Sequence, residues 1–230
     1  MIQQLQNTIA GPSAPELFDE VYTIVCLGRM GSGKTAKSMK MLDQFHNDGW
    51  ETCFCPGNDK PVPGGLLPPW MHQCSPLNPR FVENTVYLFD DWHLVRHSRE
   101  WRDEISIAIQ RTETKNRQFN RKFIFNTQHS KQIDTSQASW NVGATCFNKH
   151  SLRQAKSERQ EVKEMALEAS RAFRHYEDLG YNYKELIYIF TDAVDENLEG
   201  KGEMFKMSLP DWWSEGLSTY LSGTKKKRNL

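Results

Sequence analysis

A glycine-rich segment near the N-terminus has the residue types and spacing of a phosphate-binding loop. Gly28-Arg-Met-Gly-Ser-Gly-Lys34-Thr35 matches the pattern G-x-x-x-x-G-K-[ST] at every fixed position. Glycines let backbone N–H groups converge on phosphate oxygens, and the start of a helix adds a favourable dipole. Lys34 is expected to bridge the β- and γ-phosphates of a nucleotide, and the Thr35 hydroxyl to bind Mg²⁺. The predicted nucleotide-binding residues are Gly28, Arg29, Met30, Gly31, Ser32, Gly33, Lys34, Thr35 and Ala36.

Two adjacent carboxylates follow an apolar run further along the chain. Val86–Phe89 is apolar, and Asp90 and Asp91 come directly after it. Nucleotide sites of this class need an acid at a strand tip to hold Mg²⁺, which is the role predicted for Asp90. Asp91 is predicted to accept a proton from the attacking water. Taken alone, the pattern also fits a strand followed by an Asp-rich turn, but the upstream loop favours the catalytic interpretation.

A third polar group follows the apolar run Phe123–Phe125. Asn126, Thr127 and Gln128 come at its end. Because the C-terminal ends of parallel strands share the ligand crevice, these side chains are expected to face the γ-phosphate. Gln128 is predicted to orient the attacking water or to report hydrolysis to the next element. A polar loop start is the alternative.

Strands and helices in alternation are needed to position these groups. Apolar, β-branched runs predict strands, and apolar residues at helical spacing predict helices. The order predicts an α/β domain with a mainly parallel central sheet flanked by helices. Residues 56–80 are rich in proline and are expected to be irregular. The expected strands are 21–27, 51–55, 85–89, 122–126, 144–148, 186–190 and 204–207, and the expected helices are 34–46, 99–117, 152–179 and a short one opened by Pro210.

The chain of 230 residues has the length of one α/β domain with additions. We expect a polar N-terminal extension over residues 1–20 and an ATPase core over 21–150. Residues 151–222 are expected to add a helix and strands packed on the core, and residues 223–230 form a basic tail.

Composition and charge limit the kinds of partner. Hydrophobic residues make up 38% and charged residues 25%, with a net charge of zero, so a polyanion would have to bind at local patches. The basic residues of such patches can also serve only to solubilise the protein, because acids such as Glu158, Glu161 and Glu164 lie near some of them in the sequence. Both interpretations stay open. The candidate patches are Lys115, Arg117, Arg121 and Lys122, then Lys149, His150, Arg153 and Lys156, and the tail residues Lys225–Arg228.

The chain has five cysteines, an odd number, and neither an export signal nor a long apolar run is visible in it. These features favour reduced thiols inside a cell. Cys53, Cys55, His72 and Cys74 are donor types that could form a zinc site. The first pair has the spacing C-x-C instead of the C-x₂₋₄-C typical of zinc, and Glu51–Pro56 resembles a strand. The sequence therefore does not favour zinc here.

Three segments in this order, GRMGSGKT, VYLFDD and FIFNTQHSKQID, resemble the FtsK–HerA superfamily of DNA-pumping ATPases. Within it, residues 21–150 are most similar to genome-packaging ATPases of tailless icosahedral viruses with an internal membrane. The resemblance implies a RecA-like P-loop NTPase fold, with ATP and Mg²⁺ as cofactors and the sensor strand between the P-loop strand and the acid strand. It also implies Walker roles for Lys34, Thr35 and Asp90 and a sensor role for Gln128. Asp91 stands where the family usually has a glutamate.

Members of this superfamily work as rings in which one subunit supplies an arginine to its neighbour's nucleotide. Arg111 and Arg117 are the candidates here, with Arg121 as a third. The resemblance implies a homo-oligomeric ring, hexameric or pentameric, that acts on double-stranded DNA without stable membrane insertion. It also implies capsid-vertex or inner-membrane partners, in the cytoplasm of an infected host cell or on the virion. The alternatives are an assembly ATPase that does not pump DNA and a small-molecule kinase.

Overall fold

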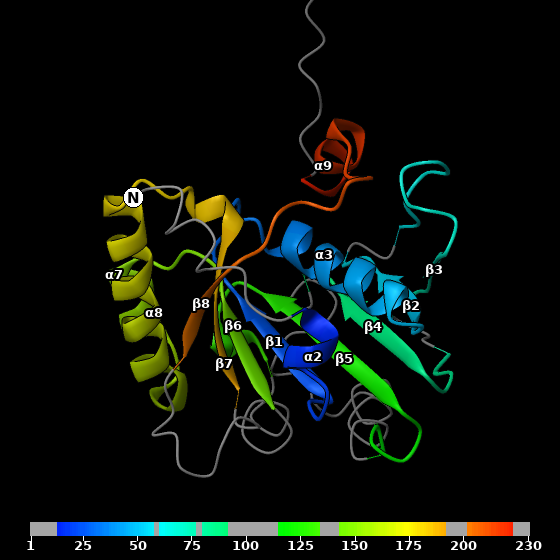
Figure 1. The fold of residues 1–230 in the computed structure, drawn as a ribbon, viewed down its shortest axis with the longest axis horizontal. Coiled ribbons are helices and arrows are strands. Elements are labelled where there is room, and N and C mark those ends of the chain that lie inside the picture. The colour runs from blue at the N-terminus through cyan, green and yellow to red at the C-terminus, as the bar shows by residue number, and fades with distance from the viewer. Residues whose placement is uncertain are drawn as a thin grey trace, which may run out of the picture.

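The computed structural model describes residues 13–57, 60–76, 80–91, 115–133, 143–191 and 202–222. Its centre is an eight-stranded sheet in the order β3-β2-β4-β5-β1-β6-β7-β8 (Figure 1). The strands from β3 to β6 pair in parallel, and β7 and β8 continue the sheet antiparallel. The bounds are β1 Thr23–Leu27, β2 Glu51–Cys55, β3 Met71–Gln73, β4 Thr85–Phe89, β5 Arg121–Thr127, β6 Ala144–Phe147, β7 Leu186–Thr191 and β8 Glu203–Lys206.

Helices cover both faces of the sheet. On one face, α3 (Lys34–Asn47), α2 (Ala14–Leu17) and α9 (Glu215–Leu221) enclose one apolar core. On the other, α7 (Leu152–Ser157) and α8 (Gln160–Asp178) lie toward the β6–β8 end and enclose a second (Figure 1). Every residue of β1, β4 and β5 is buried, because these parallel strands have a layer on each face. The predicted α/β class with a mainly parallel sheet is confirmed.

The predicted long helix over 152–179 is interrupted, so this prediction was wrong in detail. Glu158 has φ −65° and ψ 168°, an extended conformation that separates α7 from α8. Its side chain is fully buried against the segment after β5. Hydrogen bonds from that segment to the carboxylate favour this inward position over another helical turn.

The proline-rich segment is partly regular, in contrast to its predicted irregularity. Met71–Gln73 forms β3 at the edge of the sheet, paired in parallel with β2. Val62, Leu66, Leu67 and Trp70 pack on the core beside α3, where the rings of His46 and Trp70 stack with centroids 4.1 Å apart. Trp212 donates from Nε1 to the Asp43 carboxylate at 3.0 Å. Residues 62–71 of this segment therefore contribute to the core on the α3 face, whereas Cys74 packs against the core on the opposite face.

The helix predicted at Pro210 starts later than expected. It begins at Glu215 because Ser214 caps it, with its hydroxyl accepting a hydrogen bond from the N–H of Leu217 at 3.1 Å. Trp212 and Trp213 therefore precede the helix and pack against the core instead of lying on it. The short 3₁₀ segments are η1 (Ser130–Gln132) and η2 (Tyr183–Glu185).

Residues 13–20 of the predicted extension pack on the core. Phe18 is buried, and the ammonium group of Lys122 donates to the carbonyls of Phe18, Asp19 and Val21 at 2.7, 2.7 and 3.0 Å. A buried lysine with three acceptors anchors this segment to β5. The helix predicted for 99–117 lies outside the described residues except for 115–117, which form a turn, and the basic tail 223–230 also lies outside them. Among the described helices, none has the length and hydropathy to span a membrane.

Candidate nucleotide-binding site

The glycine-rich loop joins the end of β1 to the first turn of α3. Gly33 caps α3 with φ 88°, a left-handed conformation that strains any residue with a Cβ. Lys34 begins the helix and is only 6% exposed, so this lysine is buried at the loop. The sequence thus folds here into the strand–loop–helix unit that the motif predicts.

The predicted Mg²⁺ ligands from two distant segments meet directly. The hydroxyl of Thr35 on α3 donates to the Asp90 carboxylate after β4, at 2.9 Å to Oδ1 and 3.2 Å to Oδ2. Asn126 on β5 donates from Nδ2 to Asp90 Oδ1 at 2.8 Å, and its own Oδ1 accepts from Ser38 at 2.7 Å. This chain of four side chains fixes the rotamer of Asp90. Asn126 has a positioning role that its sequence position after an apolar run could only suggest.

Asp90 is a buried carboxylate at 4% exposure. Burial and the neighbouring charge of Asp91 raise the pKa of Asp90 to about 6, although hydrogen bonds from Asn126 and Thr35 act in the opposite direction. A cation at this carboxylate would relieve both unfavourable effects. Hydroxyl and carboxylate oxygens are the donors that Mg²⁺ prefers, so Thr35 and Asp90 fit the predicted metal role.

The loop also fits a phosphate. Ser32 Oγ is buried without a hydrogen-bond partner among the described residues, and Lys34 lies two positions further on. Unpartnered buried hydroxyls are rare in folded proteins unless a ligand or water satisfies them. A phosphate oxygen at the mouth of the loop would accept from Ser32 and Lys34 together.

Asp91, the predicted base, occupies a constrained position. Its φ of 43° is left-handed, and it lies directly beside Gly57. A Cβ on Gly57 would approach the Asp90 carbonyl oxygen to 2.4 Å and the Asp91 Cβ to 2.9 Å, so only glycine fits there. The turn that presents the two acids is therefore held against the segment after β2. The base role of Asp91 stays a prediction.

Gln128 directly follows β5, which lies between β4 and β1. This is the strand order that the resemblance implied. The backbone around Gln128 is fixed by two glutamines: Gln132 Oε1 accepts from the hydroxyl of Thr127 and the N–H of Gln128 at 2.9 and 3.1 Å, and Gln154 Nε2 donates to the Gln128 carbonyl at 3.1 Å. The sensor role of Gln128 stays a prediction. Its main chain lies at the C-terminal ends of the parallel strands, as Asp90 does.

Glu158 is a buried residue that sequence reasoning placed among solubilising acids. Its carboxylate accepts from the N–H and hydroxyl of Ser130, both at 2.7 Å, and its Oε1 lies 3.2 Å from His129 Nδ1 and 3.3 Å from His150 Nε2. Burial alone would raise the pKa of Glu158, but the hydrogen bonds from His150 and Ser130 outweigh it and lower the pKa to about 2. Glu158 therefore ties the α7–α8 junction to the segment that follows Gln128. No local sequence signal distinguishes it from Glu161 or Glu164.

The two arginine candidates in the described part of the chain, Arg117 and Arg121, do not meet the site within this subunit. Arg117 is exposed in the turn before β5, at the opposite end of that strand from Gln128. Arg121 is 7% exposed with its guanidinium 4.4 Å from the Phe119 ring centroid, which leaves it poorly placed to reach a neighbouring subunit. Arg111 lies outside the described residues. Arg117 and Arg111 remain predictions.

Neither a protein-family model nor a curated protein sequence matches the chain. Solved structures match its fold. The genome packaging NTPase B204 from Sulfolobus turreted icosahedral virus 2, in complex with AMPPCP, has a TM-score of 0.54 and 11% identity over 83% of this chain and 99% of that one. The DNA-packaging ATPase B204 from Sulfolobus turreted icosahedral virus has a TM-score of 0.51 and 11% identity over 81% and 98%.

The conjugation coupling protein TcpA of pCW3, in a monomer form with ATPγS, has a TM-score of 0.54 and 12% identity. The similarity covers 84% of this chain and 61% of TcpA. This chain therefore has the fold of these P-loop ATPases, and the resemblance drawn from its three sequence segments is confirmed at the level of the fold.

Proposed function

We propose that this chain is a Mg²⁺-dependent ATPase that moves double-stranded DNA, and that it packages a viral genome into a capsid. The observation that carries the ATPase part is the contact of Thr35 with Asp90, fixed by Asn126, beside the buried Lys34. The phosphate-binding loop, Asp90 and Gln128 all follow the C-terminal ends of neighbouring parallel strands, where in-line hydrolysis needs them to meet. The fold in common with a DNA-packaging ATPase and a conjugation coupling protein supports the DNA part.

In the proposed reaction, the site residues neutralise phosphate charge, hold the cation, orient the attacking water and accept its proton. Lys34 Nζ neutralises charge on the β- and γ-phosphates, and Thr35 and Asp90 hold the cation. Mg²⁺, when bound, supplies charge neutralisation between the phosphate oxygens. Asp91 accepts the proton of the attacking water, and Gln128 orients that water. Arg111 or Arg117 of a neighbouring subunit would neutralise charge in the transition state, which requires an oligomer, proposed here as a pentameric or hexameric ring.

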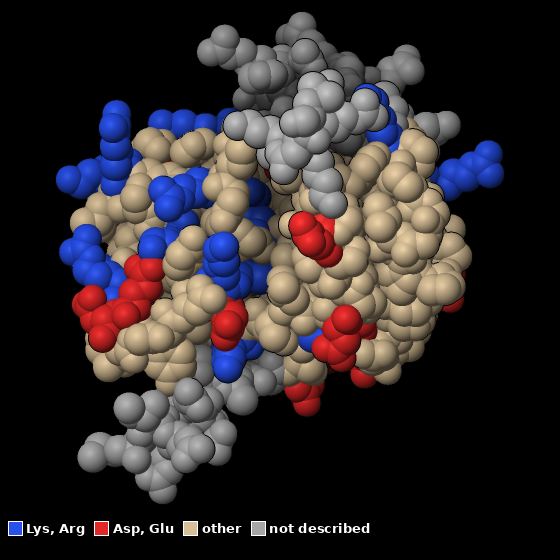
Figure 2. All heavy atoms as spheres, turned by 90° about the horizontal axis from the view of Figure 1, so that it is seen from above, with Lys and Arg blue, Asp and Glu red and all other residues tan. Residues whose placement is uncertain are grey.

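A basic surface suited to a DNA backbone lies on the side of α7 and α8. Figure 2 shows that lysine and arginine side chains gather over one half of this view, whereas fewer of them lie on the visible part of the other half. Of the predicted patch after β6, Arg153 and Lys156 are exposed, Lys149 pairs with Glu177, and His150 is buried. Of the other predicted patch, Arg121 and Lys122 lie on β5 and are buried, whereas Lys115 and Arg117 in the preceding turn are exposed. The exposed basic residues near α7 and α8 are Arg153, Lys156, Arg171, Arg174 and Lys184.

A DNA pump needs contacts with phosphates and none with bases, and ring symmetry multiplies a modest patch. A packaging role places the ring at a capsid vertex or on inner-membrane components, in the cytoplasm of an infected host cell or on the virion. The capsid and membrane partners are thus proposed because genome packaging requires them.

The decisive measurement is the steady-state ATPase rate with and without long double-stranded DNA, with Lys34→Ala as the blank. We expect DNA to raise the wild-type rate several-fold and the blank to stay inactive under both conditions. Hydrolysis that ignores DNA would contradict the pump and favour an assembly ATPase. Transfer of phosphate to an added small acceptor would favour a kinase.

The double variant Arg153→Ala/Lys156→Ala is expected to reduce the affinity for DNA about equally for unrelated sequences. Removal of two phosphate contacts should lower the slope of log affinity against log salt by about 2 per subunit. The check is a salt titration of DNA-stimulated ATPase activity. Lys60→Ala, an exposed lysine in the segment between β2 and β3, is the control and should leave the slope unchanged. Equal effects of the two variants would exclude the α7–α8 surface as the DNA contact.

A further inference from the structure

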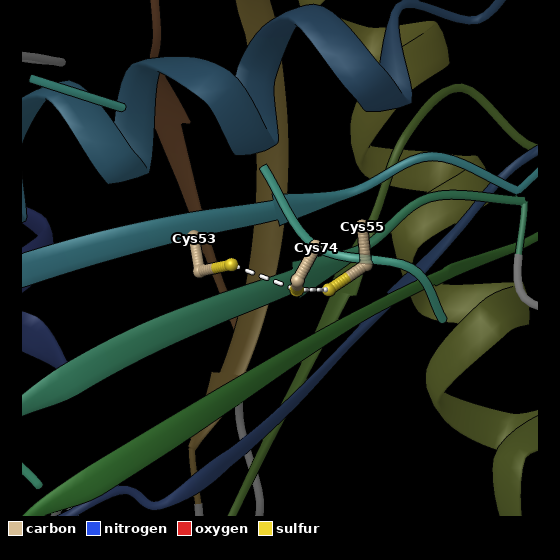
Figure 3. A group of neighbouring side chains, drawn as sticks. All are labelled: Cys53, Cys55 and Cys74. Atoms are coloured by element: carbon tan, nitrogen blue, oxygen red, sulfur yellow. Dashed lines mark hydrogen bonds between the residues drawn. The ribbon is translucent and has the colours of Figure 1, made fainter. Parts of the chain in front are cut away.

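Three thiols meet at the β3 edge of the sheet, outside the nucleotide site. Cys53 and Cys55 lie on β2, and Cys74 follows β3 directly. The sulfur of Cys74 is 2.7 Å from the sulfurs of both Cys53 and Cys55, and all three sulfurs lie within 4.8 Å of one another. Figure 3 shows Cys74 placed between the other two.

The strand periodicity explains why the C-x-C spacing brings these sulfurs together. Residues two apart on a strand point to the same face, so Cys53 and Cys55 share one side of β2. β3 pairs in parallel with Cys53 opposite His72, and the N–H of Cys74 donates to the Phe54 carbonyl at 3.1 Å, which extends the pairing by one residue. Cys74 therefore joins the same face. The C-x₂₋₄-C rule describes ligands on turns, and it led the sequence argument away from this cluster.

This cluster has features that the other thiols of the chain lack. Cys55 is fully buried, whereas Cys74 is partly exposed and lines, with Cys53 and His72, a pocket of about 690 Å³. An ion could thus enter from solvent and still be held in the interior. Cys26 and Cys146, in register on β1 and β6, form only a pair. In the described ranges, the three-thiol cluster is the one place where three potential metal-binding side chains converge.

We propose that Cys53, Cys55 and Cys74 bind one Zn²⁺ ion through their sulfurs, with its fourth position open to the pocket. A disulfide would use two sulfurs and leave the third without a partner, whereas one soft ion accepts all three. Each cysteine binds as a thiolate, so loading releases the thiol protons to solvent. Tetrahedral Zn–S bonds of about 2.3 Å would place the sulfurs about 3.8 Å apart. The two 2.7 Å contacts would therefore open by about 1 Å, and Cys74, on the loop after β3, is best placed to move.

His72 was the fourth donor considered from the sequence, and it does not join the convergent sulfurs. Its Nε2 lies 3.3 Å from the carboxylate of Glu51, and its side chain is largely exposed. The described structure thus supplies three sulfur ligands, not the four-residue set that the sequence suggested.

The site would brace the backbone next to the two acids. The Cys55 carbonyl accepts from the N–H of Asp90 at 3.0 Å, and Gly57 packs on the turn of Asp90 and Asp91. An ion that joins β2 to the loop after β3 would therefore hold the segment between them in place. This inference does not depend on the proposed function, because it concerns the metal content and order of the chain.

The test is metal analysis of the full chain, produced with zinc and purified without chelator. We expect about one zinc ion per chain, and on Co²⁺ replacement a thiolate-to-cobalt charge-transfer band. Cys74→Ala and Cys55→Ala should lose the ion and the band, whereas Cys146→Ala, which removes a thiol from the other pair, should keep both. Cys74 is partly exposed, so its variant should fold normally, as circular dichroism can verify.

A chelator should also speed proteolysis within residues 56–76 of the wild type and leave Cys74→Ala unaffected, because that variant starts without the ion. Wild-type protein without zinc after loading would overturn the proposal, as would equal zinc contents in the wild type and Cys74→Ala. A thiol count under denaturing conditions that is two short would show a disulfide instead and would also overturn it.

Discussion

Replacement of Asp90 by asparagine is expected to abolish ATP hydrolysis while making the nucleotide-free protein more stable. An amide cannot supply the charge that holds the cation, so we expect the rate to fall by about 100-fold or more, as when one essential electrostatic contact is removed. The amide oxygen can still accept from Thr35 at 2.9 Å and from Asn126 at 2.8 Å. The two properties should therefore change in opposite directions.

The gain in stability follows from burial of a charge beside another charge. Asp90 is 4% exposed, and burial together with Asp91 raises its pKa to about 6. At pH 8 the ionised carboxylate therefore destabilises the folded state, and the neutral amide should raise the free energy of unfolding by about 3 kcal/mol. The measurements are ATP hydrolysis with Mg²⁺ and thermal unfolding in a chelator.

Asp48→Asn, at an exposed position after α3, is the matched control and should change neither property. A variant at Asp90 that hydrolyses ATP at the wild-type rate would contradict the assignment of the metal-binding acid. A lower unfolding temperature would show that the carboxylate stabilises the empty site.

Replacement of Glu158 by glutamine is expected to destabilise the protein by about 3 kcal/mol at pH 7. Its carboxylate accepts from the N–H and hydroxyl of Ser130, and the pKa of Glu158 is lowered to about 2 from an ordinary value of 4.5. A carboxyl group with a lowered folded-state pKa contributes stability above its unfolded pKa and loses it as the pH falls through the folded value. The contribution should therefore be complete above about pH 5 and decrease between about pH 4.5 and pH 2.

Urea unfolding at pH 7 and pH 3 checks this prediction. The difference between the wild type and Glu158→Gln should fall to about half at pH 3, because protonation then removes much of the wild-type advantage. Glu161→Gln, on an exposed position of the first turn of α8, should have almost no effect at either pH. A difference that stays constant with pH would mean that the carboxylate charge is not the source of the stability.

Glu158 and its neighbours at the α7–α8 junction contact the segment that follows β5. Gln154 donates to the Gln128 carbonyl at 3.1 Å, and Arg159 donates to the Ile133 carbonyl at 2.5 Å. Together with Glu158, these side chains hold both ends of the segment that follows the sensor strand. We therefore expect Glu158→Gln to lower the maximal ATPase rate as well, measured with saturating ATP, since Ser130 and His129 next to Gln128 would lose their contact with the carboxylate.

The sequence alone determined the strands of the core and the residues of the phosphate loop. Short runs of apolar, β-branched residues predicted β1, β2, β4, β5 and β6 within about two residues, because buried parallel strands need apolar side chains on both faces. The G-x-x-x-x-G-K-[ST] pattern is similarly local: each of its residues acts within one strand–loop–helix unit. The α/β fold class and the place of Asp90 directly after a buried strand followed from these local signals.

Only the tertiary structure decided which polar residues are buried and what they contact. Glu158, Lys122 and Arg121 resemble solvated charges in the sequence, yet each is buried by elements distant along the chain. The break after α7 depends in the same way on Ser130, 28 residues away from Glu158. The three thiols meet because β3 adds to the edge of β2, a pairing that no local pattern specifies. Periodicity reports burial averaged along one element, whereas the partner of a polar group depends on the packing of several elements.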